Sequence, residues 1–329
     1  MGEGLMLIGN DSARAALAAA MASGNLHHAW LIAGPEGVGK GMFARAAALR
    51  LLAEGAGRDH LAPGWDVPEE SQTVHLVNAG AHPDYRELVR LPKDPDKPDE
   101  ALARSITIAQ VRSLQPLFAT KPSFSSRRVI VIDAIDDLER GGANALLKNL
   151  EEPPAGTIFL LVSHAPGRLL PTIRSRCRLL RFEALPDADV SAILREQLPD
   201  ANGNEIAALV KAGEGSPGRA LGFAGLDIAA IESEMVALAE TGDPSNMIRS
   251  RLAKLLGIKA AQPRYEAFLE RAPSFIAERA KPLSGDALRT ALDAYGAARE
   301  LGGAATGLSL DASSTVFEMG GILARLGRA

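Results

Sequence analysis

The chain has 329 residues, with 36 Lys and Arg against 40 Asp and Glu, so its formal net charge at pH 7 is −4. This length, with 47% hydrophobic residues, predicts two or three globular domains. The single cysteine, Cys177, excludes an internal disulfide and a four-thiolate zinc site, and it favours a reducing cytoplasm. The acidic balance argues against a protein that binds nucleic acid through a large basic surface. The apolar runs are too short to cross a membrane, so we expect no membrane partner.

The first half of the chain alternates short β-branched runs with longer segments of helical period, which is typical of an α/β fold with a parallel sheet. The predicted elements, in chain order, are a strand at 29–33, helices at 40–53 and 105–118, a strand at 129–132, a helix at 142–152 and strands at 157–162 and 179–182. The helix at 40–53 is expected to bury Phe43, Ala47 and Leu51. Residues 54–100 stay unassigned, and 92–100 within them have the composition of a solvated loop.

From Pro186 onward Ala, Leu, Glu and Arg dominate, which predicts an all-helical second half. We therefore expect an α/β domain over 1–184, a small helical lid domain over 185–225 and a C-terminal all-helical domain over 226–329. The helices expected in the lid are 187–198, 204–212 and 217–223.

A glycine loop at residues 34–40 reads GPEGVGK and matches the phosphate loop G-x-x-x-x-G-K. The backbone amides of such a loop hold phosphate groups, and its lysine neutralises their charge. The next residue should be Ser or Thr, whose hydroxyl binds magnesium, and Gly41 has no side chain to offer. A plain glycine turn that caps a helix is the alternative, but the strand before it and the helix after it favour a phosphate loop. The candidate nucleotide-binding residues here are Gly34, Gly37, Gly39 and Lys40.

An acidic residue, Asp133, follows the predicted strand at 129–132, where an active ATPase places the aspartate that binds magnesium. The next residue should be the glutamate that orients the attacking water, but it is Ala134. Asp136 and Asp137 lie close by, and we interpret them as helix N-caps. The two losses predict that this chain alone does not hydrolyse ATP, whereas weak binding of ATP or ADP stays open.

Five further motifs resemble the bacterial clamp-loader branch of the AAA+ ATPases. They are HHAWL at 27–31, HPD at 82–84, NALLKNLEEPP at 144–154, SRC at 175–177 and GSPGRAL at 215–221. Because the nucleotide site is degraded, the chain is more similar to a non-motor subunit of that family than to a motor subunit.

The resemblance covers residues 8–221 and implies an AAA+ phosphate-loop domain, a lid and a collar domain used for assembly. It implies that Arg176 is an arginine finger that enters the ATP site of a neighbouring subunit; spacing alone would favour a surface salt bridge. Arg219 falls where a lid arginine reaches back to the phosphates, although it could instead fix the lid against the first domain. Ser163 or His164 occupies the first-sensor position, and either could simply cap the strand end.

The resemblance also implies partners. A stator of this kind works with ATP-hydrolysing motor subunits and a clamp-opening subunit of the DNA polymerase III holoenzyme to place the sliding clamp on primer-template DNA. One alternative is a catalytically active AAA+ ATPase, either a motor subunit or a stand-alone remodelling enzyme, and another is an interaction scaffold that never meets nucleotide. Lys121, Arg127 and Arg128 are candidates for DNA contact, although a solvated surface is the favoured interpretation of each.

No cofactor is required for such a stator, and we expect no metal. Many clamp-loader subunits carry a four-cysteine zinc module, whereas residues 54–81 contain no cysteine. The histidines His60, His75 and His82 lack metal-ligand spacing, so we interpret them as structural.

Overall fold

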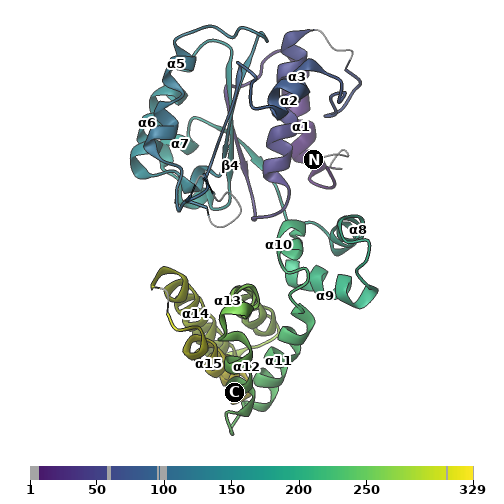
Figure 1. The fold of residues 1–329 in the computed structure, drawn as a ribbon, viewed down its shortest axis with the longest axis vertical. Coiled ribbons are helices and arrows are strands. Elements are labelled where there is room, and N and C mark those ends of the chain that lie inside the picture. The colour runs from purple at the N-terminus through teal and green to yellow at the C-terminus, as the bar shows by residue number, and fades with distance from the viewer. Residues whose placement is uncertain (1–6, 58–60, 95, 97–101, 309, 329) are drawn as a thin grey trace. The chain divides into compact units, whose positions relative to one another are not determined.

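The computed structural model describes residues 7–57, 61–94, 96, 102–308 and 310–328, and its chain divides into two compact units (Figure 1). The first unit is Met1–Asp189 with Gly215–Gly218, and the second is Val190–Glu214 with Arg219–Ala329. Residues of the expected lid therefore occur in both units. The boundaries near 184 and 225 stay a prediction.

The first unit is built on a parallel sheet of five strands in the order β2-β3-β4-β1-β5. The strands are β1 Ala29–Ala33, β2 Tyr85–Val89, β3 Arg128–Asp133, β4 Thr157–Ser163 and β5 Arg178–Arg181. Ala33 pairs with Ser163 and Val89 pairs with Asp133, so the carboxyl ends of these strands meet at one edge of the sheet. This architecture confirms the predicted α/β class.

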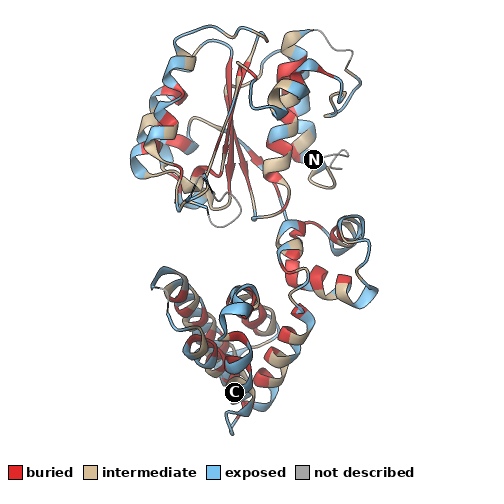
Figure 2. Cartoon of the chain, in the orientation of Figure 1, coloured by how far each residue is buried: buried red, intermediate tan, exposed pale blue. Residues whose placement is uncertain are grey.

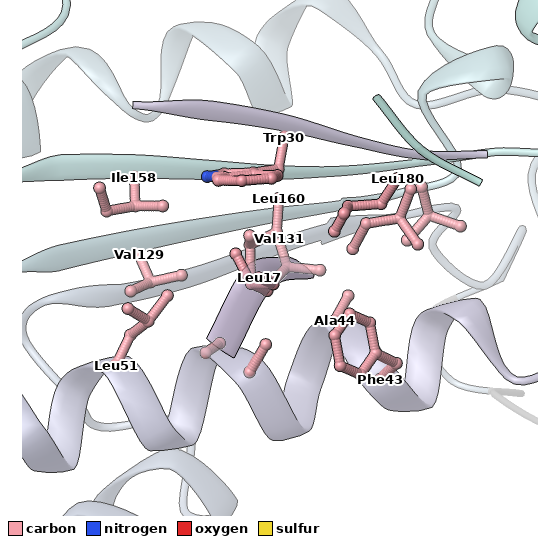
Figure 3. Packing of buried hydrophobic residues seen from close by; sticks show 14 of the residues in the cluster. Leu17, Trp30, Phe43, Ala44, Leu51, Val129, Val131, Ile158, Leu160 and Leu180 are labelled. Atoms are coloured by element: carbon pink, nitrogen blue, oxygen red, sulfur yellow. The ribbon is translucent and has the colours of Figure 1, made fainter. Parts of the chain in front are cut away.

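Helices cover both faces of this sheet (Figure 1). One face carries α1 Asp11–Ala22, α2 Lys40–Ala56 and α3 Gln72–Asn78, and the other carries α4 Ile108–Arg112, α5 Gln115–Phe118, α6 Arg140–Glu151 and α7 Pro171–Arg174. The predicted burial of Phe43, Ala47 and Leu51 is confirmed, since all three are fully buried. Figure 3 shows Phe43 and Leu51 of α2 facing the buried side chains of the sheet.

The helix expected at 105–118 is instead two short helices, α4 and α5. Thr107 and Gln110 form a capping box that starts α4. Pro116 has no amide hydrogen to donate to Arg112, so one continuous helix cannot run through this position. The prediction of a single helix was wrong because it weighed the apolar period and overlooked the proline.

Part of the segment left unassigned by sequence is fixed to α2. Arg50 is 8% exposed, and its guanidinium donates hydrogen bonds to the carbonyl oxygens of Ala62 (2.6 Å) and Asp66 (3.2 Å). Trp65 packs edge-on against Phe43, with ring centroids 4.9 Å apart. The predicted solvated loop at 92–100 lies largely outside the described residues, at 95 and 97–100. Within the described part, Lys93, Asp94 and Asp96 are exposed.

The described residues of the second unit form helices joined by loops and turns, without a strand, as predicted. Its helices are α9 Gly203–Gly213, α11 Ile228–Thr241, α12 Met247–Leu256, α13 Gln262–Ala280, α14 Gly285–Leu308 and α15 Ala312–Leu323. Two further helices, α8 Asp187–Gln197 and α10 Pro217–Gly222, have residues in both units. Figure 2 shows buried residues alternating with exposed ones along the helices of the bundle. This amphipathic pattern explains why the sequence shows helical period here.

A buried arginine joins several helices of the second unit. Arg271 of α13 is fully buried and forms ion pairs with Glu232 (2.6 Å), Glu278 (2.8 Å) and Glu214 (3.3 Å). Glu232 comes from α11 and Glu214 from the end of α9, so this cluster fixes the end of α9 to the C-terminal bundle. Among the described residues no helix combines the length and apolar character that a membrane span requires.

Candidate functional site

The glycine loop, residues 34–39, connects β1 to α2 at the carboxyl edge of the sheet. A Cβ atom at Gly34 would lie 2.1 Å from the carbonyl oxygen of Phe182, so only glycine fits between these strands. Gly39 has φ 89°, a left-handed conformation that favours glycine, and its carbonyl accepts the amide of Phe43 to begin α2. The local sequence thus produces the strand, loop and helix arrangement that a phosphate-binding loop needs.

Lys40 is folded into this loop. The side chain is 2% exposed, and its ammonium donates hydrogen bonds to the carbonyl oxygens of Gly34 (2.8 Å) and Pro35. Burial lowers the pKa of Lys40 to about 8, although nearby Asp133 and Glu36 oppose this shift. The lysine therefore satisfies the loop's own carbonyl groups in this conformation.

Gly41 and Asp133 lie against each other. A Cβ atom at Gly41 would come within 2.2 Å of Oδ2 of Asp133, so the carboxylate uses the space that a serine or threonine side chain would need. Burial raises the pKa of Asp133, and the charges of Arg45, His164 and Lys40 oppose that rise. Asp133 can occupy this position only because residue 41 has no side chain.

Arg45, on α2 one turn after Gly41, also faces this carboxylate. Its guanidinium lies 2.6 Å from a carboxylate oxygen of Glu87 and 3.7 Å from Oδ2 of Asp133. The sequence analysis missed Arg45 and Glu87. The only available signal was the i,i+4 spacing of Gly41 and Arg45, which places both on one face of the helix.

Asp136 anchors the end of β4. Its carboxylate accepts hydrogen bonds from the Ser163 hydroxyl (3.0 Å) and from the amides of His164 (2.7 Å) and Ala165 (3.0 Å). The interpretation of Asp136 as a helix N-cap was therefore wrong, because its acceptor oxygens serve the neighbouring strand. Asp137 is not a cap for α6 either, since Glu139 precedes that helix, and it instead forms an ion pair with Arg90 at 3.1 Å.

Residues 215–218 lie on the glycine loop. The Ser216 hydroxyl donates to the carbonyl of Glu36 (2.7 Å), and the Gly218 amide donates to the carbonyl of Gly37 (2.9 Å). A Cβ atom at Gly218 would lie 2.9 Å from the Cα atom of Gly37. Ser216 and Gly218 of this motif thus both contact the loop, and neither carries a cationic side chain that could neutralise a phosphate group.

Arg219, the next residue, belongs to the second unit. Its guanidinium forms ion pairs with Glu214 (2.6 Å) and Glu270 (2.8 Å) and donates to the Ser274 hydroxyl (3.2 Å). These partners lie at the end of α9 and on α13. A contact of Arg219 with nucleotide stays a prediction.

Arg176 follows α7 in the turn before β5. Its guanidinium forms an ion pair with Glu151 at the end of α6 (2.6 Å) and donates to the carbonyl of Thr172 (2.7 Å). The side chain is 32% exposed, whereas its neighbours Arg174 and Arg178 are exposed. Two of the motifs that carry the family resemblance, NALLKNLEEPP and SRC, therefore meet at this ion pair.

Cys177, beside this arginine, is protonated at neutral pH. Burial raises the pKa of its thiol to about 12, so it supplies no thiolate. Among the described residues no group of three or more His, Cys, Asp and Glu side chains is arranged to hold a metal ion. His75 is exposed, and His60 lies outside the described residues.

The HPD motif forms a buried polar cluster at the amino-terminal ends of β2 and β3, away from the glycine loop. Asp84 accepts hydrogen bonds from the amides of Ser123 (2.9 Å), Phe124 (2.7 Å) and Ser125 (2.9 Å), and the Nδ1 atom of His82 accepts the amide of Asp84. This motif therefore shapes the loop before β3. These hydrogen bonds give the motif a role in folding.

The basic residues near this loop differ in exposure. Arg128 is 1% exposed, and its guanidinium donates to the carbonyl of Thr120, so the favoured interpretation of a solvated surface was wrong for this residue. Arg128 begins β3, a strand whose residues 128–132 are all buried, and the Thr120 carbonyl satisfies its guanidinium. Arg127 lies 3.5 Å from Glu54, and Lys121 is exposed.

Comparison with known proteins gives a family match over the first unit. A family model described as "DNA polymerase III, delta subunit" matches residues 9–186. The chain is 37% identical over 191 residues to DNA polymerase III subunit delta' of Pseudomonas aeruginosa, covering 58% of this chain and 53% of the relative. It is 33% identical over 224 residues to the same subunit of Escherichia coli, covering 68% and 62%. The aligned part is thus between about half and 62% of the length of these relatives.

A similar solved structure is a DNA polymerase III gamma subunit-related protein of Thermotoga maritima. It is 17% identical, with a TM-score of 0.38, over 92% of this chain and 96% of that protein.

Proposed function

The chain belongs to the DNA polymerase III, delta subunit family, and from that membership we propose that it acts as the delta' subunit of a clamp loader. In this role it helps to load the sliding clamp on primer-template DNA and hydrolyses no ATP itself. The observation that carries the proposal is the packing of Asp133 against Gly41, in the space that a magnesium-binding side chain would need.

Three positions around the glycine loop support the absence of hydrolysis. Gly41 offers no hydroxyl, Ala134 offers no carboxylate to orient water, and the segment 215–218 offers no cation where Ser216 and Gly218 meet the loop. An active ATPase of this kind uses all three kinds of group to stabilise the transition state. The proposed role needs no cofactor, and any ATP or ADP that the loop binds would be held weakly and released unchanged.

The proposed partners are the motor subunits gamma or tau and the clamp-opening delta subunit, in the cytoplasm. With a net charge of −4 the chain is poorly suited to hold DNA alone. We propose that it meets the clamp and the primer-template DNA only as part of the assembled complex.

Within that complex we propose that Arg176 is an arginine finger for the ATP site of a neighbouring motor subunit. A guanidinium beside the outer phosphate stabilises charge in the transition state, which is worth ~10³ to 10⁵ in rate at the site concerned. In the free chain the same guanidinium is held by Glu151 and the Thr172 carbonyl, which orients it at the protein surface. The cost of exchanging Glu151 for a phosphate is small because both partners of this pair are partly exposed.

The finger is tested by ATP turnover in a complex reconstituted from motor subunits, delta subunit, clamp, primed DNA and this chain. We expect the wild-type chain to stimulate turnover and Arg176→Ala to lose most of that stimulation while it still assembles, as judged by size-exclusion chromatography. Arg174→Ala is the matched control, because this exposed arginine lies two residues away. Equal turnover with wild type and Arg176→Ala would contradict the role of Arg176.

A further inference from the structure

Magnesium is the cation that an AAA+ nucleotide site implies, and the residues around Asp133 do not fit it. Mg²⁺ requires near-ideal octahedral coordination by oxygen atoms, usually one or two carboxylates together with a hydroxyl, water or phosphate. Gly41 contributes no oxygen, and Oδ2 of Asp133 lies where the side chain of residue 41 would begin. The carboxylate is thus turned toward the helix backbone instead of being free to bind a metal ion.

A cation of the chain itself already faces this carboxylate. The Arg45 guanidinium lies 3.7 Å from Asp133 and 2.6 Å from Glu87, and the Tyr85 hydroxyl donates to the second carboxylate oxygen of Glu87 at 3.1 Å. A guanidinium is always ionised, and its planar donors suit carboxylate pairs. Arg45 therefore gives these two acidic side chains a permanent counter-charge.

The positions of these groups follow from the fold. Glu87 lies on β2 and Asp133 ends β3, the strand that pairs with β2, so both carboxylates approach the same helix. Arg45 lies on α2 one turn beyond Gly41, where its guanidinium reaches both carboxylates. The ammonium group of Lys40, at the start of α2, donates its hydrogen bonds to carbonyl groups of the glycine loop. The ion pair with Asp133 is formed by Arg45.

We propose that the Arg45 guanidinium replaces the divalent cation of this site and excludes Mg²⁺ from Asp133. The proposal deepens the proposed loss of hydrolysis, on which it rests for the identity of the site. It predicts a nucleotide site that is permanently metal-free, and it assigns the exclusion to one side chain.

The test measures binding of Mn²⁺, a paramagnetic substitute for Mg²⁺, to the full isolated chain without nucleotide, by electron paramagnetic resonance. Wild type should show no Mn²⁺ affinity that depends on Asp133, so Asp133→Asn should leave binding unchanged. Arg45→Met should bind Mn²⁺ at least about tenfold more tightly, because two neighbouring carboxylates lose their counter-charge. The double variant Arg45→Met/Asp133→Asn should lose that gain.

Two controls separate the site from general charge effects. Arg112→Met removes the same charge from an exposed position on α4 and should not change Mn²⁺ affinity. Arg45→Lys keeps the positive charge and should keep the exclusion. Unfolding of each variant is followed by circular dichroism to confirm that it is folded.

Three results would overturn the proposal. These are a wild-type Mn²⁺ affinity that falls in Asp133→Asn, a folded Arg45→Met that gains no affinity, and a gain that survives in the double variant. The comparison of wild type with Asp133→Asn can still overturn the exclusion of the ion from Asp133 if Arg45→Met does not fold, and Arg45→Gln then serves as the second variant for the role of Arg45. No nucleotide is present, so these results are distinguishable from failure of the proposed function, which is judged by ATP turnover.

Discussion

At residue 41 the absence of a side chain determines how the neighbouring carboxylate packs. Asp133 lies so close to α2 that any Cβ atom at this position would collide with it. Restoring the side chain that an active ATPase requires therefore means moving Asp133, and with it the contact to Arg45. The residue that lacks the magnesium-binding hydroxyl is thus also the residue against which Asp133 packs.

We predict that Gly41→Ser destabilises the first unit by about 1–3 kcal/mol, the usual cost of overfilling a packed site. Urea unfolding followed by circular dichroism measures this change. Gly167→Ala is the control, because a Cβ atom at Gly167 would meet nothing within 4 Å. An equal, small effect of both substitutions would show that Asp133 yields easily and would weaken the packing argument.

The lowered pKa of Lys40 predicts that the stability of the chain depends on pH. Its pKa is about 8 in the folded chain and 10.5 ordinarily, so between these values the unfolded chain binds more protons than the folded chain. The contribution of Lys40 to the free energy of unfolding therefore increases as the pH rises from about 8 to 10.5. Below pH 8 both states are protonated and the contribution is constant.

The measurement compares unfolding midpoints of wild type and Lys40→Met at pH 7.5 and pH 10. Relative to the variant, wild type should gain stability at the higher pH. A difference between the two proteins that is the same at both pH values would contradict the lowered pKa of Lys40.

At the scale of helices and strands, the buried parallel strands were predictable because β1, β3 and β4 are continuous apolar runs. Strand β2 was not predictable, since it is an edge strand with two consecutive charged residues, Arg86 and Glu87, and Leu88 is its one buried residue. The glycine loop and Asp133 were predictable from local spacing. Arg45, Glu151 and Gly218 were not, because their partners are distant in sequence and only the folded chain brings them together.

We predict that the buried ion-pair cluster around Arg271 stabilises the packing of the helices in the second unit. Replacing Arg271 with Met leaves Glu214, Glu232 and Glu278 without their shared counter-charge, which should cost about 3–5 kcal/mol. Arg251→Met is the control, because Arg251 pairs with Glu234 at a largely exposed position and should contribute at most about 1 kcal/mol.

Thermal or urea unfolding of the two variants measures whether the buried cluster contributes more to the free energy of unfolding than the exposed pair does. Comparable stability of Arg271→Met and Arg251→Met would mean that the buried charges are hydrated in solution, and the proposed fixation of α9 to the bundle would then fail.

At the scale of the whole molecule, the match to the family model lies in the first unit and does not extend into the second. The family match covers residues 9–186, which lie in the first unit with the glycine loop and Arg176. The helical second unit was predicted from composition and period alone. Its role in assembly remains a proposal that rests on the expected collar.

The central claim is that the chain carries the remains of a nucleotide site and does not hydrolyse ATP, and ATP turnover by the isolated full chain tests it most directly. With saturating ATP and Mg²⁺ we predict a rate equal to the protein-free background and unchanged in Lys40→Ala. A rate well above background that disappears in Lys40→Ala would contradict the account and identify the chain as an active AAA+ ATPase.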